Sequence, residues 1–157
     1  MKRNFVRVAL MSLALASTLA NAATDFSGTW VLDPAKSDFG AGTGAAKSSM
    51  ASVTLVIKQT PTILTTERKT GDQTGTAIHK LDGSPSVNKT PSGADVTSTS
   101  NWVGDTLVTK SRAVIQGAPA ESSDVRSLGE GGKTMIIEIT RQAPRGEVKQ
   151  RLVYNRR

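Results

Sequence analysis

The sequence predicts an all-β protein, an antiparallel up-and-down meander of about 8–10 strands that forms a closed or nearly closed barrel. Runs rich in β-branched residues alternate apolar and polar side chains with a period of two, which is typical of half-buried strands. Turn residues separate these runs at nearly regular intervals, and no amphipathic helix long enough for a crossover stands between them. Such strands pair with their sequence neighbours, and closure removes the edges that an open meander would expose.

The first 22 residues have the pattern of an export signal. Basic residues precede an apolar run over residues 8–20, which is shorter than the about 20 apolar residues that a membrane-spanning helix needs. Ala20-Asn21-Ala22 then matches the small-x-small pattern of a cleavage site. We therefore predict cleavage after Ala22, which leaves residues 23–157 as one exported domain, periplasmic or secreted, without a transmembrane segment. A leader that stays attached as an anchor helix is the alternative.

Composition and charge exclude several classes of function. The chain has no cysteine, which excludes disulfides, and its formal charge of +7 includes Lys2, Arg3 and Arg7 of the leader, so the mature domain carries +4. These charges are interspersed with acids and not with aromatic residues, so we expect no nucleic-acid partner. Basic residues do gather near the C-terminus, among them Lys149 and Arg151. The alternative function is therefore an envelope structural or interaction protein with a filled core and a basic exposed face.

The predicted strands follow in order from the N-terminus. The first carries Gly28-Thr29-Trp30, and another contains His79. Runs of β-branched residues predict further strands at residues 53–58, 62–68, 96–103, 106–115, 134–140 and 148–154. Turn residues are found at positions 70–72, 82–84, 91–93, 104–105, 117–119, 129–132 and 144–146. Residues 39–51, rich in Gly, Ala and Ser, are predicted to form a flexible loop, because Ala46 stands where a phosphate-binding loop needs a glycine.

Residues that could perform catalysis or bind a metal are scarce. His79 is the only histidine, no Gly-x-Ser-x-Gly elbow surrounds a serine, and no cluster of metal ligands has a recognisable spacing. Five aspartates are predicted at turns or strand ends: Asp25, Asp33, Asp82, Asp105 and Asp124. We therefore predict no catalytic residue, no metal and no cofactor. A hydrolase with barrel-facing carboxylates is the alternative.

The opening of the mature chain resembles that of a known group. Gly28-Thr29-Trp30 resembles the Gly-x-Trp motif of the calycins, which include the lipocalins and the fatty-acid-binding proteins. Residues 26–37 also look like the opening F-S-G-x-W-x-L-D-x-x-K-S of uncharacterised bacterial exported lipocalin-like proteins. The resemblance implies a barrel in which Trp30 packs over one end, beneath a basic side chain of the last strand such as Arg151 or Arg156.

The final strand departs from the pattern of the fatty-acid-binding proteins. That pattern is Arg-x-Tyr, and here Leu152 takes the arginine position two residues before Tyr154. Because side chains alternate between the two faces of a strand, Gln150, Leu152 and Tyr154 are predicted to face the interior. Lys149 and Arg151 then face solvent. Capture of a fatty-acid carboxylate by that route is not expected, and a different or neutral apolar ligand would fit better.

These observations predict a non-catalytic, monomeric protein that binds a small hydrophobic or amphipathic molecule inside the barrel. Trp102 begins a Trp-x-Gly hairpin similar to one in the fatty-acid-binding proteins. Together with Gln150, Leu152 and Tyr154, it is predicted to line the ligand site. The mature domain has few aromatic residues and many Thr and Ser, so its interior is expected to have either a thin core or a partly polar lining.

Overall fold

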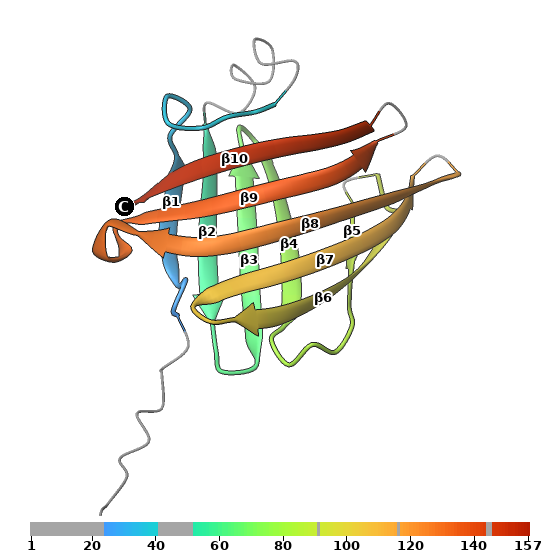
Figure 1. The fold of residues 1–157 in the computed structure, drawn as a ribbon, viewed down its shortest axis with the longest axis horizontal. Coiled ribbons are helices and arrows are strands. Elements are labelled where there is room, and N and C mark those ends of the chain that lie inside the picture. Colours follow the sequence, from blue (N-terminus) through green and yellow to red (C-terminus); the bar gives the residue numbers. More distant parts are fainter. Residues whose placement is uncertain (1–23, 41–51, 91, 116, 144–145) are drawn as a thin grey trace, which may run out of the picture.

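One antiparallel sheet of ten strands forms the fold. The computed structural model describes residues 24–40, 52–90, 92–115, 117–143 and 146–157. The strands lie in the order β4-β3-β2-β1-β10-β9-β8-β7-β6-β5, so all neighbours except β1 and β10 are consecutive in sequence. The strands are β1 (Gly28–Leu32), β2 (Val53–Gln59), β3 (Ile63–Thr70), β4 (Gln73–Lys80), β5 (Ser86–Lys89), β6 (Asp95–Val103), β7 (Thr106–Ile115), β8 (Ala118–Gly129), β9 (Thr134–Ala143) and β10 (Gly146–Arg156). The predicted nearly closed meander is confirmed (Figure 1).

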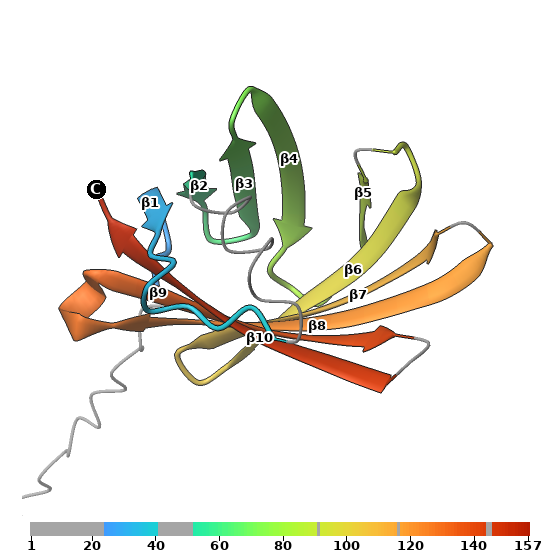
Figure 2. The same ribbon diagram turned by 90° about the horizontal axis from the view of Figure 1, so that it is seen from above.

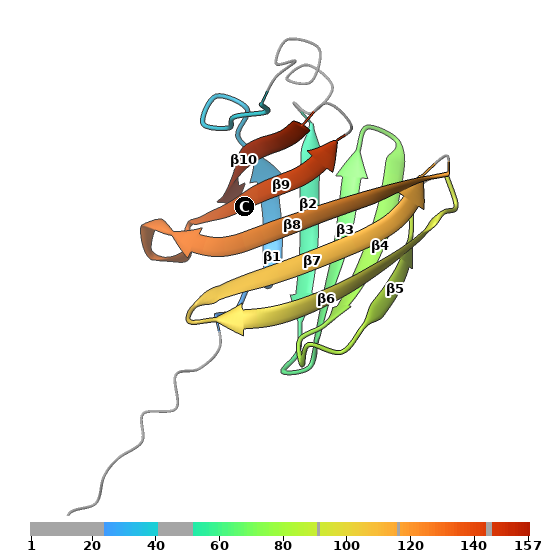
Figure 3. The ribbon, with the colours of Figure 1, turned by 45° about the vertical axis from the view of Figure 1, so that its right-hand side comes forward.

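The sheet curls so that its two halves face each other. Strands β1–β4 form one wall, and the long strands β6–β10 cross in front of them as the other wall (Figures 1 and 3). Pairing of β1 with β10 joins the walls on one side, where Trp30 lies opposite Arg156. On the other side the edge strands β4 and β5 face each other (Figure 2).

Side chains, and not a backbone ladder, close the seam between β4 and β5. The Ile78 amide on β4 donates to Asn88 Oδ1 on β5 (2.8 Å), and Asn88 Nδ2 donates to the Ile78 carbonyl oxygen (2.9 Å). The Lys80 amide donates to Ser86 Oγ (2.9 Å). Backbone groups on the edge of a sheet are otherwise left free, so these three bonds bring the barrel close to full closure.

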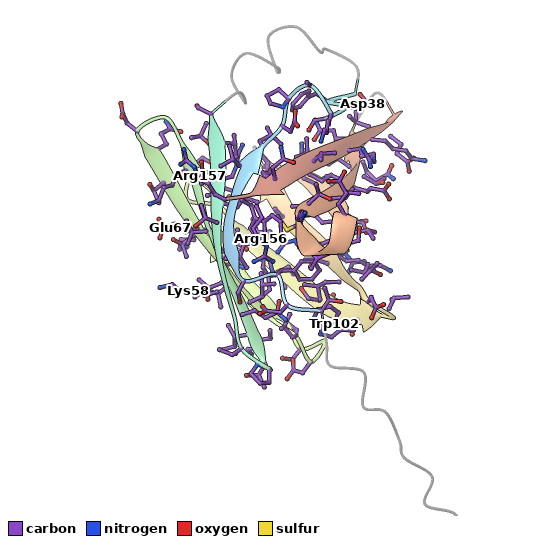
Figure 4. The ribbon with its side chains drawn as sticks, turned by 90° about the vertical axis from the view of Figure 1, so that its left-hand side faces the viewer. Asp38, Lys58, Glu67, Trp102, Arg156 and Arg157 are labelled. Atoms are coloured by element: carbon purple, nitrogen blue, oxygen red, sulfur yellow. The ribbon has the colours of Figure 1, made fainter. Side chains whose placement is uncertain are left out.

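The meander places its connections alternately at two ends. The β2–β3, β4–β5, β6–β7 and β8–β9 connections lie at one end, which we call the closed end; the last of these includes a 3₁₀ turn at Glu130–Gly132. The other paired strand ends, of β3 and β4, β5 and β6, β7 and β8, and β9 and β10, lie at the opposite end, the mouth. Figure 4 shows Trp102 at the closed end and Asp38 at the mouth.

The interior contains both apolar and polar buried side chains. Its apolar core consists of Phe26, Trp30, Leu32, Phe39, Val53, Leu55, Ile57, Leu64, Leu81, Leu107, Met135, Ile137, Ile139, Leu152 and Tyr154. The hydroxyls of Ser98, Ser100 and Thr109 are also buried, and the last two are hydrogen-bonded at 2.8 Å. This agrees with a partly polar interior. Among the residues that the structure describes, no helix has the length and hydrophobicity of a membrane span.

Most predicted strands are confirmed, and two observed strands, the short β5 and the long β8, were not predicted. The runs of β-branched residues and the turn residues correspond to the observed strands and their connections. The sequence APAESSDVRSLG of β8 contains only one β-branched residue, so it gave no strand signal. As a consequence, the prediction that Asp124 lies at a turn or strand end is wrong: it lies within β8. The predicted leader, 1–22, and residues 41–51 of the predicted loop lie outside the described residues.

Candidate functional site

The closed end is sealed by the tryptophan of β1 and an arginine of β10. Trp30 is fully buried, and its Nε1 donates to the Phe26 carbonyl oxygen (2.9 Å). The guanidinium of Arg156 lies 4.3 Å from the centre of the Trp30 ring, a cation–π contact, and donates to the carbonyl oxygens of Ser27 and Gly132 (both 2.9 Å). Figure 4 shows Arg156 where β1 and the C-terminal strand meet.

Gly28 of the Gly-x-Trp motif makes room for this arginine. A β-carbon at position 28 would lie 2.9 Å from Arg156 Nη1, and φ of +136° at this position is strained for any residue with a side chain. The structure therefore places Arg156 in the covering position that the calycin resemblance implies. Arg151 lies elsewhere: its backbone pairs with Asp38 toward the mouth, and its side chain is exposed.

Phe26 forms the floor of the interior. Its ring stacks on Trp102 with 5.9 Å between ring centres and 6° between ring planes. The backbone amide of Phe26 donates to Gln59 Oε1 (3.1 Å), and the backbone amide of Gln59 donates to Ser27 Oγ (3.0 Å). The N-terminal segment is thus fixed across the closed end by β2.

The rest of the F-S-G-x-W-x-L-D-x-x-K-S motif also holds the barrel together. Asp33 Oδ2 accepts from Asn155 Nδ2 (3.1 Å), and Ser37 Oγ accepts from the Val153 amide (2.9 Å). Both contacts connect the chain after β1 to β10. The residues of this motif therefore hold the barrel closed.

A cavity of about 350 Å³ lies inside the barrel between the two walls. Six strands contribute to its lining: β2, β3, β4, β8, β9 and β10. The lining residues are Leu55, Thr66, Arg68, Ala77, His79, Asp124, Arg126, Ile137, Ile139, Arg141, Gln150, Leu152 and Tyr154. Eight of these thirteen side chains are polar or charged, so the cavity offers specific hydrogen bonding in addition to apolar contact.

Arg126 is the most unusual side chain in this lining. It lies in a cross-strand row with Leu107 on β7 and Ile137 on β9, and its guanidinium lies 5.8 Å from the centre of the Phe26 ring. Its Nη1 is buried and has no hydrogen-bond partner among the described residues. Burial lowers the pKa of Arg126, while the Asp124 carboxylate opposes this change. A buried guanidinium nitrogen without an acceptor is energetically unfavourable, so an anion from outside would stabilise it.

The position of Arg126 bears on the expectation of a different or neutral apolar ligand, which was based on Leu152. Leu152 pairs with Ile137, which pairs with Arg126, so all three side chains lie in one row across the same wall. The final strand indeed lacks a guanidinium at position 152. However, β8, which lies two strands from β10 in the sheet, supplies the guanidinium of Arg126 to the same cavity.

Two further arginines lie around the cavity. Arg68 on β3 and Arg141 on β9 line it, but both side chains are largely exposed. Arg141 Nη1 donates to Gln150 Oε1 (3.2 Å), and Gln150 Nε2 donates to the Phe39 carbonyl oxygen (3.0 Å). Because Asp124 is the only acidic residue among the described residues of the lining, these residues carry an excess of positive charge, which attracts anions.

Tyr154 supplies a neutral phenol to the same cavity. It is only 2% exposed, and burial raises its pKa to about 12, while Arg68 and Arg126 oppose this rise. The phenol therefore keeps its proton at neutral pH and is available as a hydrogen-bond donor.

His79 belongs to the cavity wall and to the nearby seam. Its Nδ1 lies 3.1 Å from Ser98 Oγ on β6, which is 2% exposed and is not part of the lining. Burial, together with the charge of Arg126, lowers the pKa of His79 to about 4. A histidine that is such a weak base and bonds to a serine buried behind it is better suited to holding the wall together than to activating a nucleophile.

The lowered pKa of His79 makes stability depend on pH. In the unfolded chain His79 takes up a proton near its usual pKa of 6.5, whereas in the folded chain it does so near 4. Between these values the unfolded state binds more protons, so the free energy of unfolding falls as pH is lowered from 7 to 4.5. We expect His79 to account for about 1–3 kcal/mol of this loss, measured by urea unfolding. A His79→Gln variant should lose that part of the pH dependence; an unchanged slope would contradict the assignment.

The structure brings three of the four predicted lining residues together. Gln150, Leu152 and Tyr154 line the cavity, as the alternation along β10 predicted, and whether they contact a ligand stays a prediction. Trp102 does not belong to the cavity lining, since it is stacked on Phe26 at the closed end. Asp124 and Arg126 were missed because β8 was not recognised as a strand.

The comparison with solved structures supports the fold. The structure described as "REP1-NXSQ fatty acid transporter" is similar to this chain with a TM-score of 0.62 and 18% sequence identity, over 83% of this chain and 95% of that one. No protein-family model and no curated protein sequence matches the chain. The similarity supports the antiparallel barrel fold.

Proposed function

We propose that this protein is an exported, non-catalytic carrier that binds a small amphipathic anion inside its barrel. The single observation that supports this most strongly is Arg126, a half-buried arginine of the cavity lining whose buried Nη1 has no partner among the described residues. A carboxylate or similar group would accept charge-assisted hydrogen bonds from it. The export signal predicted at residues 1–22 is the basis for the exported location.

The arrangement of the lining fits an amphipathic molecule with one charged end. Arg126 and Tyr154 offer donors to an anionic head, whereas Leu55, Ile137 and Leu152 offer apolar contacts to a hydrocarbon chain. The cavity volume of about 350 Å³ lies near the lower limit of ligand pockets, which is about 300 Å³. The similar barrel of a protein described as a fatty acid transporter also supports a carrier function.

The alternative of an envelope protein with a filled core has less support. A cavity of about 350 Å³ speaks against a filled core. Of the two basic residues on the proposed exposed face, Lys149 is paired with Glu147 at 3.1 Å, which reduces the charge that this face presents.

Titration calorimetry of the purified protein with decanoate and with decanol tests the proposal. The two probes share an alkyl chain and differ in charge. We expect decanoate to bind at least about tenfold more tightly, because a hydrogen bond to a buried charged group contributes about 1.5–3 kcal/mol. Equal affinity for the two probes, or binding of neither, would contradict the proposal.

A further inference from the structure

Asp124 is the second charged side chain on the cavity face of β8. It stands two residues before Arg126, so both side chains point to the same side of the strand, and their α-carbons lie about 7 Å apart at the usual rise per residue. The five ion pairs among the described residues, all within 4.0 Å, include neither Asp124 nor Arg126. The wall therefore presents a cation and an anion as two separate groups.

The Asp124 carboxylate lacks a donor of its own. Its cross-strand neighbours are Thr109 and Ile139, and the Thr109 hydroxyl is paired with Ser100 (2.8 Å). Within the described part of the chain, no side chain or amide donates a hydrogen bond to Asp124. Burial raises the pKa of Asp124, while Arg126 and Arg141 oppose this rise. The Asp124 oxygens are not among the fully buried atoms without a partner, so solvent reaches them, and a donor on a ligand would take the place of that water.

A second polar atom in the cavity also lacks a partner. Thr66 on β3 belongs to the lining, is 9% exposed, and its buried Oγ1 has no hydrogen-bond partner among the described residues. Thr66 Oγ1 and Arg126 Nη1 are thus two buried polar atoms of this cavity without a partner, and Asp124 lies on the same lining. A plain alkyl carboxylate can accept hydrogen bonds from the guanidinium and from the Thr66 hydroxyl, but it has no donor to offer to Asp124.

We infer that the ligand is a hydroxylated carboxylic acid with an apolar chain, and that Asp124 selects it by accepting a hydrogen bond from its hydroxyl. This inference rests on the proposed function, since Arg126 binds the carboxylate. A hydroxyl a few bonds from the carboxylate suits two groups on one face of a strand. An ammonium group would also pair with Asp124, but Arg68, Arg126 and Arg141 around the same cavity would repel it.

The test compares decanoate with 3-hydroxydecanoate by titration calorimetry. The unaltered protein should bind the hydroxy acid about tenfold more tightly, since the extra hydrogen bond has a charged acceptor. In Asp124→Leu, which keeps the side-chain shape, the two acids should bind equally well. If this variant fails to fold, Asp124→Asn serves instead, and its weaker acceptor should reduce the preference to about threefold or less. Asp95→Leu, on an exposed aspartate paired with Lys89, is the control and should keep the full preference.

The outcomes separate this inference from the proposed function. One outcome would refute the role of Asp124 but leave the carrier function intact. In it, decanoate binds more tightly to the unaltered protein than to Arg126→Met, and 3-hydroxydecanoate binds no more tightly than decanoate. A preference for the hydroxy acid that persists in Asp124→Leu would likewise refute it. If neither acid binds, the proposed function and the role of Asp124 are both refuted.

Discussion

Replacing Arg126 by methionine is expected to weaken decanoate binding by about 10- to 100-fold, the effect of losing hydrogen bonds to a charged, buried group. Methionine retains much of the side-chain length but cannot donate. The affinity for decanol should change little, because the apolar part of the lining stays intact. Calorimetric titration of both probes into both proteins measures the effect.

The same change should leave the fold at least as stable. The guanidinium is desolvated and its Nη1 has no partner, so an apolar side chain of similar length removes an unfavourable burial. Urea unfolding should therefore give an equal or higher free energy of unfolding. Arg112→Met is the matched control: Arg112 is exposed, paired with Glu121 at 3.0 Å, and should affect decanoate binding hardly at all. Loss of binding in both variants, or in neither, would contradict the role of Arg126.

Replacing Trp30 by alanine is expected to lower the free energy of unfolding by about 3–5 kcal/mol. Trp30 is fully buried, bonded to the Phe26 carbonyl oxygen and covered by Arg156, so its removal leaves a cavity where β1 and β10 meet. Urea unfolding monitored by far-ultraviolet circular dichroism measures the change.

Trp102→Ala is the control for this prediction. Trp102 is only partly buried and packs against the core, so Trp102→Ala should lower the free energy of unfolding clearly less than Trp30→Ala does. A Trp30→Ala variant that loses less than about 1 kcal/mol would mean that Trp30 does not close the barrel.

The fold was predictable because its signals are local. Alternation in β2 and the turns at Gly71 and Gly104 each depend on a few neighbouring residues. Closure was predictable because Gly28 and Trp30 form a compact motif, although the choice of Arg156 over Arg151 depended on the register between β1 and β10.

The charged part of the site was not predictable, for a physical reason. Asp124 and Arg126 lie on a strand whose inward face reads S-D-R-L at alternate positions, which looks like the solvent face of an ordinary strand. What buries Arg126 is the ring of Phe26 together with Leu107 and Ile137, all distant in sequence. Only the closed barrel brings these residues next to Arg126. A pattern of local hydrophobicity would therefore place Asp124 and Arg126 on the solvent face of the strand.

The central claim is that Arg126 holds the anionic end of the ligand, and a crystal structure of the decanoate complex tests it most directly. We expect a carboxylate oxygen at about 2.7–2.9 Å from a guanidinium nitrogen of Arg126, with the alkyl chain against Leu55 and Leu152. A carboxylate at the mouth beside Arg68 or Arg141 with the alkyl chain against Arg126, or decanoate bound only on the outer surface, would contradict the claim.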